Sequence, residues 1–323
     1  SELLMPFEIE HTTINDRPFI HLKNDDTFTA TIVPSVGAML HALEVKSNGS
    51  TFNVIDSDNP SEISGESAGV WFKGVKLSPW PCRIPNGKYR FGKKEFKLER
   101  MFKDGTSIHG LLFDQPFTIV DEMINEETAY VVLRHGYEAV DPGYPFTYQC
   151  DVKYALHPGR LLEVETTITN LSDEEIPIAD GWHPYFQLGG KVDEWELHFP
   201  AVSMVEFSEK LIPTGLLVPY QKFNEPTLIG KTNLDNCFFM KVQEFKPVCS
   251  IHNPANNISV HCYTNPSYSY LQVFIPPHRK SIAIENISSA PDAFNNMMGL
   301  IKLQAGNTRT FKVFYQVEVE ENI

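Results

Sequence analysis

Positive charge and long apolar runs are both scarce in this chain of 323 residues. Lysine and arginine number 27 against 41 aspartates and glutamates, which gives a formal net charge of −14 at pH 7. An acidic chain of this kind is poorly suited to nucleic-acid phosphates or anionic lipid surfaces. No apolar run approaches the roughly 20 residues that cross a bilayer. We therefore expect no nucleic-acid and no membrane partner, and the composition leaves the oligomeric state open.

Cysteine is also sparse, and its spacing is not that of a metal site. No Cys-x-x-Cys pair occurs, which argues against a zinc knuckle or a redox pair. The first six residues lack the basic end and apolar core of a signal peptide, although the chain does not begin with Met and removal of a leader stays open. We expect a cytoplasmic protein with reduced thiols. The five cysteines are Cys82, Cys150, Cys237, Cys249 and Cys262.

The dominant pattern along the chain is alternation of apolar residues with a period of two. It recurs in segments 28–32, 39–45, 162–168, 258–262 and 311–319, separated by Gly-, Asn- and Pro-rich turns. No stretch shows helical periodicity for more than about three turns, and 23 prolines would interrupt long helices. The pattern predicts an all-β sandwich or barrel in a single domain spanning residues 1–323. The clearest alternation comprises Phe146, Tyr148, Cys150, Val152, Tyr154 and Leu156.

Residues 179–188 read Ala-Asp-Gly-Trp-His-Pro-Tyr-Phe-Gln-Leu and combine a histidine with aromatic neighbours. Pro184 disfavours helical dihedrals at His183, so we expect an extended backbone there. In a strand Trp182 would face one side, and His183 and Tyr185 the other. An imidazole beside a phenol ring suits proton transfer near neutral pH and contact with a ring-shaped ligand. The alternative is a core histidine whose nitrogens are bonded to backbone.

Other segments carry candidate functional groups. Arg83 lies in a rigid Pro- and Trp-containing segment, and His109 precedes a glycine that permits close approach of a ligand. Glu285 ends an apolar strand, where desolvation would raise its pKa towards that of a general base working near neutral pH. The alternatives are a solvated arginine and a carboxylate that caps the following turn. The polar segment 57–69 is expected to be an exposed loop that borders a site.

Together these segments resemble the aldose 1-epimerase (galactose mutarotase) family, from about residue 25 to the C-terminus. Residues 183–188 are similar to the family's His-Pro-Tyr-Phe-Asn-Leu, and 211–215 match its Ile-Pro-Thr-Gly loop. Residues 284–295 resemble its Leu-Glu-Pro followed by Pro-Asp-Ala-x-Asn, and 83–87 resemble its Asn-Arg-Ile segment followed by a glycine. The resemblance implies a large antiparallel β-sandwich of the galactose mutarotase-like type.

The resemblance also implies roles for individual residues. Glu285 would be the catalytic base and His183 the catalytic acid of a reaction that interconverts sugar anomers. The base takes the proton of the C1 hydroxyl while the acid protonates the ring oxygen, so neither cofactor nor metal is expected. The partner would be a small-molecule sugar. The residues expected to hold it are Arg83, His109, Asp235 and Gln272.

The sequence departs from the family pattern beside the expected sugar pocket. His109-Gly110-Leu111 replaces His-Gly-Gly, Gly181-Trp182 replaces Thr-Asn, and Asn286 follows the base where proline is common. These departures leave both catalytic groups in place and leave the identity of the sugar open. We expect Glu285 and His183 to flank a gap as wide as a pyranose ring, too far apart to hydrogen-bond each other.

Four alternative functions stay open from the sequence. A carbohydrate-binding sandwich would need no acid and base. A glycosidase would pair Glu285 with Asp235 or Asp180. A metal site would use His109, His183 and Glu285, although their spacing is not that of a known zinc motif. A hexose-6-phosphate mutarotase would need several cations at the pocket, for which the candidates are Lys76, Arg83, Lys88 and Arg90.

Overall fold

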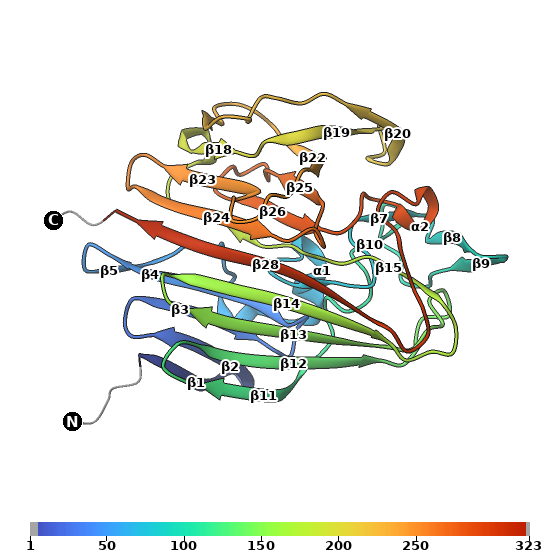
Figure 1. The fold of residues 1–323 in the computed structure, drawn as a ribbon, viewed down its shortest axis with the longest axis horizontal. Helices are drawn as coiled ribbons and strands as arrows, with labels where there is room; N and C mark the ends of the chain where they lie inside the picture. Colours follow the sequence, from blue (N-terminus) through green and yellow to red (C-terminus); the bar gives the residue numbers. More distant parts are fainter. Residues whose placement is uncertain (1–5, 321–323) are drawn as a thin grey trace.

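The longest alternating segments form the centre of a nine-stranded antiparallel sheet in the computed structural model, which describes residues 6–320. Its strand order is β11-β12-β13-β14-β28-β24-β23-β18-β21. The order from β11 to β18 can be followed in Figure 1. The strands are β11 (Thr118–Ile124), β12 (Ala129–Tyr137), β13 (Tyr148–His157), β14 (Leu161–Asn170), β18 (Glu196–His198), β21 (Thr227–Leu228), β23 (Cys249–Asn253), β24 (Ile258–Thr264) and β28 (Thr308–Val319).

A five-stranded and an eight-stranded sheet lie against the large sheet. The five-stranded sheet has the order of the chain: β1 (Phe7–Ile14), β2 (Arg17–Asn24), β3 (Phe28–Val33), β4 (Met39–Ser47) and β5 (Ser50–Asn53). The eight-stranded sheet has the order β20-β19-β22-β25-β26-β16-β6, with β17 also paired to β26. Its strands are β6 (Lys76–Leu77), β16 (Gly181–Trp182), β17 (Tyr185–Phe186), β19 (Ala201–Phe207), β20 (Pro213–Val218), β22 (Asp235–Met240), β25 (Tyr270–Phe274) and β26 (Ile282–Ile287).

The nine-stranded sheet forms one layer of a sandwich, and the two smaller sheets together form the other. Contacts between the layers show this arrangement. The Tyr154 hydroxyl of β13 donates a hydrogen bond of 2.6 Å to the Ala38 carbonyl beside β4. Phe186 of β17 packs edge-on against Tyr315 of β28, with ring centroids 5.5 Å apart. An isolated bridge between Ile55 and Phe186 joins the two smaller sheets. The expected all-β antiparallel sandwich is therefore confirmed.

Burial follows the alternation in β13. Its five predicted inward positions, Tyr148 to Leu156, are fully buried, and the residues between most of them are partly exposed. Strand β26 differs, because all six of its residues are buried. A strand covered on both faces offers its polar side chains little water. Glu285 belongs to this strand, so its carboxyl is buried among protein atoms and has little contact with water.

Helices are few and short in the described part of the chain. They are η1 (Pro60–Glu62), α1 (Gly65–Trp71), η2 (Val192–Glu194) and α2 (Ala293–Asn296). Between residues 6 and 320 the structure contains no helix with the length and apolar surface needed to span a bilayer. All five cysteines are buried free thiols, as expected. Three two-stranded sheets complete the structure, formed by β7 (Arg83–Pro85) with β10 (Thr106–Ile108), β8 (Lys88–Phe91) with β9 (Lys94–Lys97), and β15 (Ile176–Ile178) with β27 (Ile301–Leu303).

The expectation that segment 57–69 is wholly a loop is wrong, because α1 begins within it. Ser64 and Ser67 form a capping box, in which each side-chain hydroxyl bonds the other residue's backbone amide. This arrangement satisfies amides that would otherwise be unpaired at the helix start. At the other end Phe72 adopts φ +58° and reverses the chain. No residue of 57–69 lines the pocket described below, whereas Val70, Trp71 and Phe72, which follow the segment directly, do.

Candidate active site

Antiparallel pairing places three candidate residues in one row across neighbouring strands. The register of β25 and β26 sets Gln272 opposite Glu285. On the other side of β26, β16 and β17 pair with it at Gly181 and Tyr185, on either side of His183. His183 is therefore opposite Glu285, and its Nε2 atom lies 3.4 Å from Glu285 Oε1. The row Gln272–Glu285–His183 forms the floor of the site.

This geometry corrects one expectation. Glu285 and His183 do not flank a gap of a pyranose ring, because they are cross-strand neighbours on the same face of one sheet. Sequence order could not reveal this relation, since the pairing depends on how two segments about a hundred residues apart align. A ligand that contacts both groups must therefore lie across them and not between them.

The surroundings of His183 match the arrangement expected from the local sequence. Tyr185 stacks on the imidazole, with ring centroids 4.9 Å apart and an interplanar angle of 26°. Trp182 points to the opposite side, where the Lys76 ammonium lies 4.0 Å from its ring centroid. The imidazole is thus held in one orientation by a flat neighbour on the pocket side of the strand.

His109 and Cys82 lie side by side at one end of the β7–β10 pair, His109 directly after β10 and Cys82 directly before β7. Both His109 and Cys82 have positive φ values, +60° and +64°, which are uncommon for residues other than glycine. The Cys82 amide donates to His109 Nδ1 at 2.9 Å, and the His109 amide donates to the Cys82 carbonyl at 3.0 Å. Because Nδ1 accepts the hydrogen bond from the Cys82 amide, the neutral ring carries its own proton on Nε2. His109 therefore offers a hydrogen-bond donor to the pocket.

Gly110 is required beside His109. Its φ is +79°, and a Cβ atom built there would lie 2.1 Å from the Ser78 carbonyl oxygen. The sequence predicted that this glycine allows close approach of a ligand. In the structure it is the Ser78 backbone that lies close to Gly110. It fixes the chain direction that presents His109 to the pocket.

All six residues predicted from the sequence line one pocket of about 170 Å³. Gln272 Nε2 donates to Asp235 Oδ1 at 2.9 Å, and Arg83 enters from β7 with its Nε 3.2 Å from Asp104 Oδ2. The volume is below the roughly 300–1,000 Å³ of pockets for drug-sized ligands, so it suits one small molecule. The lining residues are Val70, Trp71, Phe72, Cys82, Arg83, Ile108, His109, His183, Tyr185, Asp235, Gln272, Phe274 and Glu285.

Burial dominates the ionisation of the groups in the pocket. Burial raises the pKa of Glu285 well above its usual range, with the nearby Asp235 charge adding to this and Arg83 opposing it. Burial lowers the pKa of His183 to about 3. The pKa of His109 is lowered well below its usual range by burial and, to a smaller extent, by His183 and Arg83. Both shifts favour the uncharged forms of the pair, in which Glu285 keeps its proton and His183 Nε2 can accept one.

Each residue of the floor has a buried polar atom without a hydrogen-bond partner. These atoms are Gln272 Oε1, Glu285 Oε1 and His183 Nδ1. Leaving one such atom unpaired costs about 1–3 kcal/mol, so native structures rarely keep them without a function. Three in one row indicate a site built for a ligand rich in hydroxyl groups.

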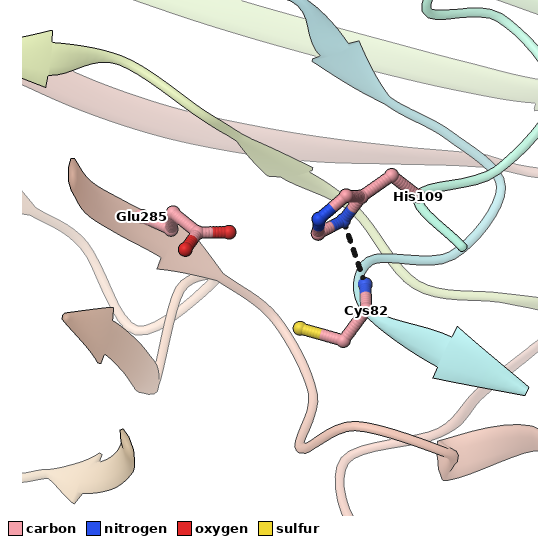
Figure 2. Close-up of side chains that lie close together, drawn as sticks. All are labelled: Cys82, His109 and Glu285. Carbon is pink, nitrogen blue, oxygen red and sulfur yellow. Dashed lines mark hydrogen bonds between the residues drawn. The ribbon is translucent and has the colours of Figure 1, made fainter. Parts of the chain in front are cut away.

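The donor chemistry argues against a metal ion here, although three possible ligands converge. The ligand atoms of Cys82, His109 and Glu285 lie within 4.8 Å of one another (Figure 2). A cation would need a thiolate, but burial raises the pKa of Cys82 well above its usual range. The lone pair of His109 Nδ1 is already engaged by the Cys82 amide, and Nε2 carries the proton. A neutral polar ligand fits these groups better.

The remaining candidates lie away from the pocket. Asp180 and Lys76 form a fully buried ion pair in the core, to which Tyr268 also donates a hydrogen bond. Asp180 therefore cannot act with Glu285 as a glycosidase pair, and Lys76 cannot bind a phosphate in the pocket. Lys88 and Arg90 are exposed on β8, where Arg90 pairs with Glu95. Of the four cations considered for a phosphate, Arg83 alone lines the pocket.

Seven lining residues were not among the six site residues predicted from the sequence, and four of the seven show what the sequence could have signalled. Cys82 and Tyr185 stood in the segments singled out, directly beside Arg83 and near His183. Phe274 stands two residues after Gln272, so alternation placed it on the same face. Trp71 gave no signal, because it lies just beyond the polar segment 57–69, which was expected to be a loop.

Comparisons with known proteins identify the family and the fold of the chain. The family model described as aldose 1-epimerase matches residues 18–316. An Escherichia coli K12 protein named uncharacterized protein YihR is 28% identical over 249 residues, which cover 76% of this chain and 78% of that protein.

Two solved structures show the same fold. A galactose mutarotase-like protein from Clostridium acetobutylicum superposes with a TM-score of 0.86 at 19% identity, covering 98% of this chain and 99% of its own. A galactose 1-epimerase from Lactobacillus acidophilus gives 0.80 at 17% identity, covering 98% and 100%.

The burial of Glu285 predicts a stability cost that depends on pH. Its folded pKa lies above the ordinary value of 4.5, so folded protein retains a proton that the unfolded chain has lost. The free energy of unfolding should therefore fall as pH rises from 4.5 through the folded pKa. In urea denaturation at pH 8, the free energy of unfolding of Glu285→Gln should exceed that of wild type by about 1–2 kcal/mol. The difference should shrink at pH 5.

The matched control is Glu95→Gln, because the Glu95 side chain is 75% exposed. It should show no such pH-dependent gain. If wild type is at least as stable as Glu285→Gln at pH 8, burial of the Glu285 carboxyl does not destabilise the folded protein, and this prediction is wrong.

Proposed function

Since the chain belongs to the aldose 1-epimerase family, we propose that it interconverts the α and β anomers of a hexose by acid–base ring opening and reclosure. The observation that carries this proposal is the contact of 3.4 Å between His183 Nε2 and Glu285 Oε1 on the pocket floor. The C1 hydroxyl and the ring oxygen of a pyranose are bonded to the same carbon. One acid and one base side by side can therefore reach both oxygens of a ring lying across them.

In the proposed reaction Glu285 is the base and His183 the acid. Transfer of the single proton from Glu285 to His183 produces a carboxylate and an imidazolium with no change in the charge of the pair. The carboxylate takes the C1 hydroxyl proton while the imidazolium protonates the ring oxygen, and the C1–O bond to that oxygen breaks. Rotation about C1–C2 exposes the other carbonyl face, and the reverse transfers close the ring. Each such group contributes roughly 10²–10⁴-fold to the rate.

The other polar residues are assigned to binding. His109 offers its Nε2 proton to a hydroxyl, and Arg83 offers guanidinium protons. Asp235 accepts a hydrogen bond from a sugar hydroxyl, and the hydrogen bond from Gln272 sets the orientation of its carboxylate. Fixing several hydroxyls orients C1 against the catalytic pair, which is where positioning lowers the barrier. With Arg83 as the cation of this group, the pocket suits a hexose without a phosphate, and we place the enzyme in cytoplasmic carbohydrate metabolism.

The proposal is tested by NMR exchange between α and β anomer signals for a panel of neutral, sulfonated and phosphorylated hexoses. Wild type should accelerate exchange for at least one neutral hexose, and Glu285→Gln should retain less than about a tenth of the rate. Glu95→Gln should match wild type. A protein that binds a sugar without accelerating exchange would be a binding module, and release of a cleaved sugar from a glycoside would show a glycosidase using Glu285 with Asp235.

The two pocket histidines should differ in their kinetic effects. His183→Asn should lower kcat about 10²-fold or more, because it removes the acid. His109→Asn should act substantially through KM, because it removes a hydrogen bond made in the ground state as well as in the transition state. His11→Asn serves as control, since His11 pairs with Glu122 on the surface. Loss of kcat in His109→Asn with only KM changed in His183→Asn would reverse the two roles.

A further inference from the structure

The short helix α1 ends at the pocket with an exposed tryptophan. Trp71 is 44% exposed, whereas Trp80, Trp182 and Trp195 are 2%, 3% and 0% exposed. Val70 beside it is 65% exposed. Large apolar rings contribute to folding by being buried, so a half-exposed indole adds little to stability for its size. Its place in the pocket lining suggests a role in ligand contact.

Trp71 is nevertheless held in a defined position. Its backbone carbonyl accepts a hydrogen bond of 2.8 Å from the Tyr185 hydroxyl. Its ring lies nearly parallel to that of Phe274, with an interplanar angle of 17° and centroids 6.4 Å apart. The turn at Phe72 directs the end of α1 to this place, because the Phe72 amide bonds back to the Ala68 carbonyl. One indole face is thus available without the disorder of a free side chain.

The neighbours of Trp71 lead directly to the catalytic pair. Phe274 stands two residues after Gln272 on β25, and its register partner on β22 is Asp235. The Phe274 ring lies edge-on to Tyr185, with centroids 6.4 Å apart, and Tyr185 stacks on His183. The chain of rings from His183 to Trp71 therefore forms an apolar wall that begins beside the polar floor and extends to the exposed indole.

We propose that Trp71, together with Phe274, is an aromatic platform that selects the sugar by stacking on a face of contiguous C–H groups on the hexopyranose ring. This inference rests on the proposed function, because the hydroxyls and C1 of the same ring contact the polar floor. An axial hydroxyl on the stacked face would be pressed against ring carbons without a hydrogen-bond partner, which is unfavourable. The platform therefore favours a hexose whose stacked face lacks an axial hydroxyl over its epimer that has one.

The first test uses the intrinsic fluorescence of Trp71. As the exposed indole among four tryptophans, Trp71 should account for most quenching by iodide in wild type. Saturating hexose should protect it from iodide, and Trp71→Phe should lose both the quenching and the protection. Hexose binding, measured by calorimetry, with unchanged iodide quenching of Trp71 would overturn the platform.

The second test measures selectivity by anomer exchange. Trp71→Ala should lower kcat/KM for the preferred hexose about tenfold, and should reduce the ratio of kcat/KM between that hexose and its axial epimer. Trp71→Phe should restore most of both, because it returns a flat ring. Phe245→Ala is the control, since Phe245 is 90% exposed and outside the pocket. An unchanged epimer ratio in Trp71→Ala would contradict selection by the platform.

The two tests separate this inference from the proposed function. If wild type accelerates no anomer exchange, the proposed function fails, and iodide protection by a bound hexose still decides whether Trp71 is a platform. If wild type is active but the hexose does not protect Trp71, the function stands and the platform is wrong.

Discussion

The adjacency of two buried proton carriers, Glu285 and His183, is the constraint on which the rest of the site depends. Antiparallel pairing on both sides of His183 sets the two opposite each other, with their nitrogen and oxygen atoms 3.4 Å apart. Burial disfavours the charged form of each group taken alone. One proton shared by the pair keeps its total charge at zero, and either arrangement of that proton supplies one acid and one base.

Keeping such a pair away from water has a cost that the surrounding structure must offset. Strand β26 is buried along its whole length, and the Lys76–Asp180 ion pair lies on the core side of the strand that carries His183. Losing one partner of a buried ion pair costs several kcal/mol, so that strand cannot shift easily. The positive φ at His109 is likewise held by two hydrogen bonds with Cys82. A large sandwich core is what permits these unfavourable features to persist together.

The fold and the composition of the site could be largely predicted from the sequence, whereas distances between segments could not. Alternation in residues 146–156 predicted an antiparallel strand whose inward side chains are fully buried. The family resemblance named six residues that share one pocket. The register that makes Glu285 and His183 neighbours depends on long-range pairing, which local patterns do not encode. Lys76 is a similar case, since nothing in its local sequence indicates the buried Asp180 that neutralises it. Trp71 was missed because two serines begin a helix in a segment whose composition is that of a loop.

The most direct test of the shared proton is the dependence of kcat/KM on pH, after subtraction of the spontaneous rate of anomer exchange. Because burial lowers the pKa of His183 to about 3, the account predicts that titration of His183 causes no change in kcat/KM around pH 6.5. Activity should fall only near or below pH 4, where the pair gains a second proton and lacks a base. It should fall again at higher pH, above the raised pKa of Glu285, where the pair loses its last proton and lacks an acid. A profile in which kcat/KM rises through about pH 4.5 and falls through about pH 6.5, the ordinary values for a carboxyl and an imidazole, would contradict the account.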